Sequence, residues 1–320
     1  MDSNDATYTS HHSLSPGNTA LITGAASGVG LAVAKLFYQK GMNIALADLN
    51  ASALSNAQNA LLSPSQSNSA ASSTDTAVAA GMVKTYTIDV SSLSDWKDLK
   101  AQVGMDFGLI HVLMLNAGTM KKSGWEDVEY FQNPTPSSLP FYPPMLMLAL
   151  KIMNTNYFGI INGISTFLPS LRKQEPASTS IIITGSKQGI TNPPGSPAYN
   201  ASKAAVKAVA EHLSYDLRDT GTDVFLLVPG WTWTGMTAGG RDGEKPEGAW
   251  WPEQVAGYLE KRMGERRFYV ICPDEAVSEG MDRKRVLWNA GDLVEGRPPL
   301  SRWREGWKEE AEKWMSEQPG

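Results

Sequence analysis

The sequence predicts an α/β fold in which a doubly wound, seven-stranded parallel sheet carries helices on both faces and ends in a C-terminal extension. Short β-rich runs alternate with amphipathic helical patterns along most of the chain, an order typical of parallel sheets. Residues 181–183 and 224–228 are continuously apolar, as expected for strands that helices cover on both sides. The seven expected strands are residues 19–23, 43–48, 82–88, 110–115, 180–184, 223–228 and 268–271.

Composition and charge indicate a globular protein and exclude several kinds of partner. Hydrophobic residues make up 42% of the 320-residue chain and charged residues 19%. The net charge of -5 provides no general basic surface, so nucleic acid is not an expected partner. Cys272 is the single cysteine, which precludes an intrachain disulfide and favours a reducing, cytoplasmic location. The four histidines lack ligand spacing, and we expect no metal site.

The chain divides into one large domain with two terminal additions. Residues 1–17 lack the basic start and apolar run of a signal peptide and predict a flexible arm. Residues 18–272 form the expected catalytic domain, with insertions near 63–80 and 121–144 and a glycine-containing substrate lid at 235–251. Prolines, a lysine and asparagines interrupt the apolar stretch 141–168, which argues against a membrane span. Residues 273–320 are an extension, packed on the domain.

A glycine-rich segment between the first strand and a helix at 31–40 predicts a nucleotide site of the Rossmann type. Small residues let the backbone approach a pyrophosphate at a helix N-terminus, where free N–H groups favour negative charge. The second strand ends in Asp48, where this fold places an acid for the adenosine ribose, and this favours NAD over NADP. A structural turn and a solvated loop acid are the alternatives. The expected cofactor residues here are Gly24, Ser27, Gly28, Val29, Gly30 and Asp48.

A second group of residues suggests proton-transfer chemistry. Ser196 and Pro197 are typical of a helix start, as N-cap and first helical residue. Tyr199 and Lys203 then lie one turn apart on one helical face, and a neighbouring ammonium is expected to lower the phenol pKa. Ser186 follows the fifth expected strand, at the sheet edge where ligands bind in such folds.

Together, these motifs resemble the short-chain dehydrogenase/reductase family over residues 18–272. The matching segments are 23–30, Asn116-Ala117-Gly118, Asn156-Tyr157-Phe158-Gly159, Ser186, 199–203 and 229–234. The resemblance implies Tyr199 as general acid/base, Lys203 as ribose ligand, Ser186 as substrate ligand and Asn156 as part of a proton relay. It also implies that Asn116 braces the sheet. Further cofactor contacts are implied for Asp89, Val90, Asn116, Ala117, Gly118, Pro229, Gly230 and Thr234.

The sequence departs from the family pattern in three places. The interval from Asn116 to Asn156 is long, and Lys187 and Gln188 follow Ser186 where small apolar residues are commoner. Asn154 competes with Asn156, but only Asn156 has glycine three residues later. The tail beyond Cys272 carries four tryptophans, and the four-residue step between Trp303 and Trp307 suggests a helix with an apolar stripe.

These features predict an NAD-dependent enzyme that interconverts a secondary alcohol and a ketone on a bulky, ring-bearing small molecule. A non-redox enzyme and a nucleotide-sensing regulator are the alternatives, since fold does not fix function. The apolar residues expected to contact substrate are Trp231, Trp233, Met236 and Trp250, although Trp250 and Trp251 are equally suited to cap the core. The helices at 156–172 and 198–218 match those that pair family members, so we expect a homodimer, with the tail blocking a second interface.

Overall fold

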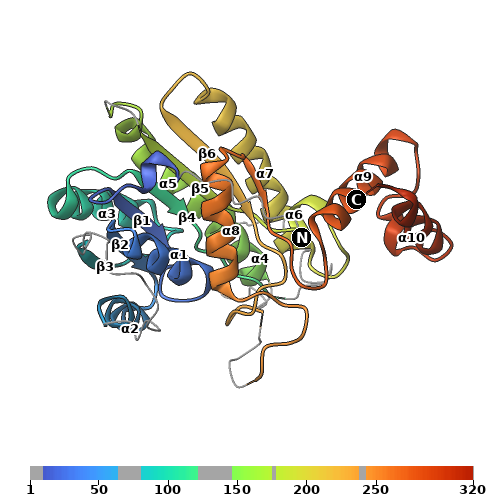
Figure 1. The fold of residues 1–320 in the computed structure, drawn as a ribbon, viewed down its shortest axis with the longest axis horizontal. Helices are drawn as coiled ribbons and strands as arrows, with labels where there is room; N and C mark the ends of the chain where they lie inside the picture. Colours follow the sequence, from blue (N-terminus) through green and yellow to red (C-terminus); the bar gives the residue numbers. More distant parts are fainter. Residues whose placement is uncertain (1–9, 64–80, 122–145, 175–177, 238–242, 320) are drawn as a thin grey trace, which may run out of the picture.

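The computed structural model describes residues 10–63, 81–121, 146–174, 178–237 and 243–319 (Figure 1). Its centre is a seven-stranded sheet in the order β3-β2-β1-β4-β5-β6-β7, with every neighbouring pair parallel. This confirms the predicted fold class, and each expected strand is present within two residues of its predicted ends. The strands are β1 Thr19–Thr23, β2 Asn43–Asp48, β3 Val83–Thr87, β4 Val112–Leu115, β5 Thr179–Thr184, β6 Thr222–Val228 and β7 Tyr269–Ile271.

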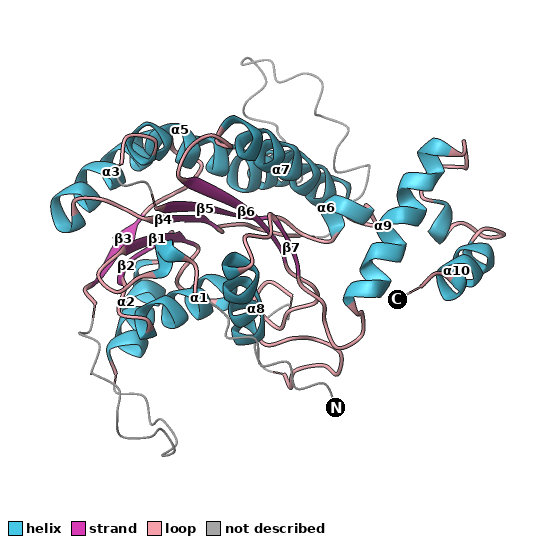
Figure 2. Cartoon of the chain, turned by 45° about the horizontal axis from the view of Figure 1, so that its top comes forward, coloured by secondary structure: helices cyan, strands magenta, loops and turns pink. Residues whose placement is uncertain are grey.

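Helices cover both faces of the sheet, as Figure 2 shows. Side chains alternate across a strand, so Ile182 packs into the core on one side of the sheet, while Ile181 and Ile183 pack on the other. The first face carries α1 Gly28–Gln39, α2 Ala51–Leu62 and α8 Pro252–Gly264. The second face carries α3 Leu93–Phe107, α5 Gly159–Leu171 and α7 Pro197–Asp216.

The strand order determines where a ligand can bind. From β1 the chain proceeds outward to β2 and β3, then returns to place β4 on the other side of β1. The segments leaving β1 and β4 therefore diverge, which opens a crevice beyond the carboxyl ends of these strands. In the chain sequence, α4 Leu146–Met153 leads through a π-helical turn, Asn154–Phe158, into α5.

The C-terminal extension is a small helical unit beside the main body (Figure 1). It consists of α9 Glu279–Val294, a 3-10 turn at Ser301–Trp303 and α10 Lys308–Glu317. Trp288 is buried against Ala311 and Met315, with Trp307 and Trp314 packed around them. The tail does contain helices, but the helix predicted from the step between Trp303 and Trp307 is wrong, because Trp303 ends a 3-10 turn and Trp307 precedes α10. Helix α9 packs against the short helix α6, Gln188–Thr191, whereas Tyr269 of β7 remains 50% exposed.

The insertions predicted near 63–80 and 121–144 lie almost wholly outside the described residues, as do 238–242 of the predicted lid. Within the described part of the chain, no helix is long and apolar enough to cross a membrane.

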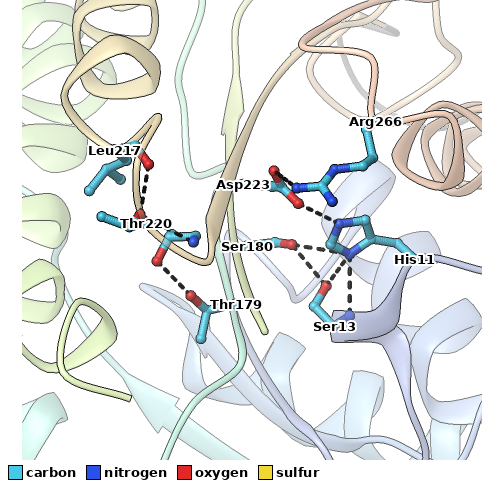
Figure 3. Close-up of polar contacts among 9 residues, drawn as sticks. His11, Ser13, Thr179, Ser180, Leu217, Thr220, Asp223 and Arg266 are labelled. Carbon is cyan, nitrogen blue, oxygen red and sulfur yellow. Dashed lines mark hydrogen bonds and ion pairs between the residues drawn. The ribbon is translucent and has the colours of Figure 1, made fainter. Parts of the chain in front are cut away.

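Part of the segment predicted as a flexible arm packs on the sheet, because His11, Ser13 and Leu14 are buried. His11 is buried in contact with the beginnings of β5 and β6 (Figure 3). The backbone N–H of Ser13 donates to His11 Nδ1 at 3.2 Å, which assigns the ring proton to Nε2, and Nε2 donates to Asp223 at 2.9 Å. Arg266 donates to the other oxygen of Asp223 at 2.8 Å.

The same contacts bring His11, His12 and Asp223 close enough for their ligand atoms to lie within 4.8 Å of one another. The linear sequence concealed this grouping because 212 residues separate His11 from Asp223. Burial would raise the pKa of Asp223, but hydrogen bonds from His11 and Arg266 outweigh it and lower the pKa. Arg266 already pairs with the Asp223 carboxylate that a metal ion would need. We therefore interpret the group of His11, Asp223 and Arg266 as a structural contact, here called the clasp, that fastens the N-terminal segment to the sheet.

The clasp predicts a stability difference between two neighbouring histidines. His11→Ala should lower the free energy of unfolding by about 1–3 kcal/mol, because it removes a buried hydrogen bond to a charged group. His12→Ala, at an exposed position that stacks on His11, should cost less than about 0.5 kcal/mol. Urea denaturation of both variants measures this difference, and equal losses would contradict the clasp.

Candidate active site

A cavity of about 730 Å³ opens at the carboxyl ends of the strands, at the crevice predicted by the strand order. Its walls come from the segments that follow β1, β2, β4, β5, β6 and β7, together with one face of α7. The predicted residues that line it are Gly24, Ser27, Gly28, Val29, Asp48, Asn116, Ala117, Gly118, Ser186, Tyr199, Lys203, Pro229, Gly230, Trp231, Thr234 and Met236. Residues more than 200 positions apart in the chain thus surround one space.

The glycine segment forms a tight loop at the start of α1. Gly24 and Gly28 have φ values of 64° and 56°, which side-chain-bearing residues rarely adopt. Gly30 does not line the cavity, and its importance is steric, because a Cβ there would lie 2.3 Å from the carbonyl oxygen of Gly24. The loop therefore presents the N-terminus of α1 to the cavity, a place that favours anions.

Asp48 lies at the end of β2, on the wall of the cavity next to this loop. Its two carboxylate oxygens accept hydrogen bonds from the backbone N–H groups of Ala26, at 3.1 Å, and Asn50, at 3.2 Å. These bonds fix the orientation of the carboxylate. Among the described residues that line the cavity, the cationic side chains are Lys187 and Lys203, both close to Ser186 in sequence or space rather than to Asp48.

Tyr199 and Lys203 project from α7 into the same cavity as Ser186. Pro197 begins α7 as predicted, although the Ser196 side chain makes no capping hydrogen bond. Burial raises the pKa of Tyr199, and a hydrogen bond with Ser186 opposes it only in part. The expected lowering by Lys203 is therefore not what the structure gives, because desolvation of the phenol dominates.

Lys203 is held by a hydrogen bond to the end of β5. Its Nζ donates to the carbonyl oxygen of Thr184 at 2.8 Å and lies 6.0 Å from the centre of the Tyr199 ring. Burial lowers the pKa of Lys203 to about 8. The lysine is thus positioned by β5, and the tyrosine is positioned by its own helix.

Asn156, and not its competitor Asn154, is directed toward the site. Asn154 is exposed, whereas Asn156 is fully buried in the π-helical turn, a feature frequent at functional sites. The Asn156 amide exchanges hydrogen bonds with the backbone of Thr119 at 2.8 and 3.0 Å and donates to Ser202 at 3.1 Å. Asn156 does not line the cavity itself. A Cβ on Gly118, which does, would lie 3.4 Å from its Oδ1.

Several residues that were predicted to contact the cofactor or the substrate do not line the cavity. Asp89 caps its own turn by accepting from Ser91, and Val90 packs against Gly159, so neither lines the cavity, and their cofactor role stays a prediction. Trp233 and Trp250 are also outside the cavity lining. The Trp250 ring lies 5.9 Å from that of Tyr258 on α8 and packs partly buried against the core, which fits the core-capping alternative, and its substrate contact stays a prediction.

Sequence reasoning missed two charged residues of the cavity wall, Lys187 and Asp274. Lys187 Nζ lies 3.1 Å from an Asp274 oxygen and 2.7 Å from an oxygen of Asp282 on α9. The sequence feature that could have indicated this group is Lys187 itself, because the family more often has a small apolar residue at the position after Ser186. The two aspartates gave no signal, because they lie in the extension and only the fold brings them to Ser186.

Comparisons with known proteins find dehydrogenases among those similar to this chain. The chain is 29% identical to 1-deoxy-11-beta-hydroxypentalenate dehydrogenase of Streptomyces exfoliatus, over 89% of this chain and 93% of that protein. It is 28% identical to 2,5-dichloro-2,5-cyclohexadiene-1,4-diol dehydrogenase of Sphingobium indicum, over 69% and 76% of the two chains.

A solved structure shares the fold over nearly the same length. A short chain dehydrogenase/reductase from Burkholderia phymatum, in complex with NAD, matches with a TM-score of 0.68 and 24% identity, over 89% of this chain and 96% of that one. The family model described as short chain dehydrogenase matches residues 18–245, which contain the glycine loop, Ser186, Tyr199 and Lys203. The chain therefore belongs to the short-chain dehydrogenase/reductase family of oxidoreductases.

Proposed function

We propose that the protein is an NAD(H)-dependent oxidoreductase that interconverts a secondary alcohol and a ketone on a ring-bearing small molecule, with Tyr199 as general acid/base. The observation that carries this proposal is that Ser186, Tyr199 and Lys203 share one cavity with the glycine loop and Asp48. Both named relatives act on hydroxylated compounds, one a neutral cyclohexadiene diol and the other a hydroxylated carboxylate, which supports a hydroxylated substrate.

The cavity suits a nicotinamide dinucleotide because the loop before α1 that lines it is built of small residues. A Cβ on Gly24 would lie 2.9 Å from the backbone of Ala117, and one on Gly28 would lie 3.3 Å from Thr234. We propose that the α1 N-terminus holds the pyrophosphate, Asp48 the adenosine ribose and Lys203 the nicotinamide ribose. When bound, the nicotinamide would supply or accept the hydride.

The protein would supply the proton. Because burial raises its pKa, Tyr199 is protonated at neutral pH, and its hydroxyl can donate to the oxygen of a carbonyl that is being reduced. Ser186 lies beside it as a hydrogen-bonding partner for the same oxygen. Oxidation of an alcohol requires the reverse transfer, for which the charge of Lys203 would stabilise the phenolate.

A homodimer also belongs to this proposal. The outward face of α7 exposes three alanines, Ala201, Ala204 and Ala208, with Tyr215 further along. Small residues allow two helices to approach closely, and such self-complementary contacts are the commonest way to form a homo-oligomer. A cytoplasmic location remains a prediction from the cysteine content.

Cofactor preference tests the role of Asp48. NADH should bind more tightly than NADPH by at least about tenfold, or 1.4 kcal/mol, because the carboxylate repels a phosphate on the ribose. Asp48→Ala should reduce this difference. Fluorescence titration of both cofactors gives the ratio, and equal affinity in the unaltered protein would refute the assignment.

Substitution of the phenol tests the acid/base role. Tyr199→Phe should lower turnover by at least about 100-fold, since it removes the proton donor, and leave NADH affinity nearly unchanged. Lys203→Ala should weaken both turnover and NADH binding. Initial rates with cyclic ketones and NADH, combined with the same titrations, separate the two effects. A Tyr199→Phe variant that keeps most of its activity would point to another acid or to a non-redox reaction.

The dimer is tested by a charge placed on its expected interface. The unaltered protein should have twice the chain mass in light scattering, and Ala208→Arg should convert it to the monomer. Ala60→Arg, at an exposed position on α2, is the matched control and should leave the mass unchanged. A monomeric unaltered protein, or a dimer that persists in Ala208→Arg, would contradict pairing through α7.

A further inference from the structure

A buried group of three charged side chains lies beside Ser186. It consists of Lys187, Asp274 and Asp282, whose side chains are only 17%, 5% and 4% exposed. Lys187 follows the predicted substrate ligand Ser186 directly, and both Lys187 and Asp274 line the cavity. Asp274 lies at the start of the C-terminal extension and Asp282 in the first turn of α9, so the extension supplies both carboxylates of the group.

The extension holds Asp282 in a rigid setting. Trp288, one and a half turns further along α9, donates its indole N–H to Ser301 at 2.8 Å, and Ser301 donates to Asp292 at 2.6 Å. Arg297 pairs with Asp292 at 3.1 Å. These bonds tie α9 to the turn before α10, and in both Figure 1 and Figure 2 α9 is the part of the extension nearest to α6.

Asp274 is equally well fixed on the other side of Lys187. One of its oxygens accepts the backbone N–H of Trp231 at 3.0 Å, and the other accepts that of Ala276 at 3.1 Å. The first bond joins Asp274 to the loop after β6, which also lines the cavity. Lys187 therefore lies between two carboxylates, of which Asp274 is fixed by backbone N–H groups and Asp282 is carried by α9.

The charges in this group leave no net positive charge for a ligand. With both carboxylates ionised, the three side chains sum to one negative charge. Burial raises the pKa of Asp282, against the effect of Lys187, and if Asp282 takes up a proton the sum is zero. Arg285 and Arg302 also act electrostatically on Asp282, but neither lines the cavity. A substrate carboxylate would meet Asp274 without a compensating cation.

Lys187 nevertheless has hydrogen-bonding capacity to offer. An ammonium carries three N–H donors; Lys187 donates a hydrogen bond to Asp274, whereas its 2.7 Å contact with Asp282 is an ion pair. Because the side chain lines the cavity, a donor is available to a ligand oxygen. A neutral hydroxyl suits this position, since it can accept from Lys187 and donate to Asp274.

We propose that Lys187, clamped by Asp274 and Asp282, is a specificity-determining residue that selects neutral ring ketones and alcohols carrying a second hydroxyl group and rejects those carrying a carboxylate. This inference rests on the proposed function, because it concerns the substrate end of the same cavity. It gives the C-terminal extension a role: Asp282 removes the positive charge that would otherwise attract anions.

A matched set of ligands tests this selection. Cyclohexanone, 4-hydroxycyclohexanone and 4-oxocyclohexanecarboxylate differ only in the group opposite the carbonyl. Binding of each to the NADH complex is measured by calorimetry, and turnover is followed as oxidation of NADH. The unaltered protein should bind the hydroxyketone at least fivefold more tightly than cyclohexanone, and the carboxylate at least fivefold more weakly.

Two variants of similar side-chain size should each change a different one of these two ratios. Lys187→Met should abolish the advantage of the hydroxyketone. Asp282→Asn should strengthen binding of the carboxylate at least fivefold with little change for the hydroxyketone, because it removes one of the two negative charges that offset Lys187. Arg283→Gln, an exposed charge change in the same turn of α9, is the control and should alter neither ratio.

The outcomes separate this inference from the proposed function. Ketones that are reduced with ratios insensitive to Lys187→Met and Asp282→Asn would overturn the inference alone. Ketones that bind with the expected ratios but are never reduced would overturn the proposed redox reaction and leave the selection in place. A preference for the carboxylate in the unaltered protein, or binding of none of the three ligands, would overturn the inference directly.

Discussion

The geometry of the site depends on a chain of hydrogen bonds that joins the carboxyl ends of β1, β4 and β5. The Asn116 amide donates to the backbone of Thr23 at 3.1 Å and accepts from the Thr184 hydroxyl at 3.1 Å. The Thr184 carbonyl in turn accepts from Lys203 at 2.8 Å. These groups are at most half-exposed, so leaving one without a partner would cost about 1–3 kcal/mol. The glycine loop, the sheet and α7 are thus fixed relative to one another.

Much of the fold followed from the sequence because its signals are local. The central strands β5 and β6 are largely continuous apolar runs because both of their faces are covered, and the other strands were found as short β-rich runs between helical patterns. The glycine loop, Ser186 and the Tyr199–Lys203 pair were identified because each lies at the end of such a run or within one helix. The same holds for Asn156, whose buried position agrees with the choice against Asn154.

The features that were missed depend on contacts between distant parts of the chain. His11 gave no sign of its partner Asp223, which lies 212 residues away and is reached only through the sheet. Trp250 was given both a substrate-contact and a core-capping interpretation because an aromatic side chain looks alike in a core and in a pocket. The pKa of Tyr199 was expected to fall because Lys203 was visible one turn away, whereas the burial that raises it was not.

The charges of the cavity divide it into two chemically different ends. At one end a single carboxylate, Asp48, is oriented by backbone N–H groups beside a helix N-terminus. At the other end Lys187 is neutralised by Asp274 and by Asp282 from the extension. The N-terminus of α1, beside Asp48, favours an anion, and the pyrophosphate is proposed to bind there. Under this proposal a ligand that spans the cavity is oriented by its charge, with the negative group at α1 and its neutral, hydroxylated part beside Ser186 and Tyr199.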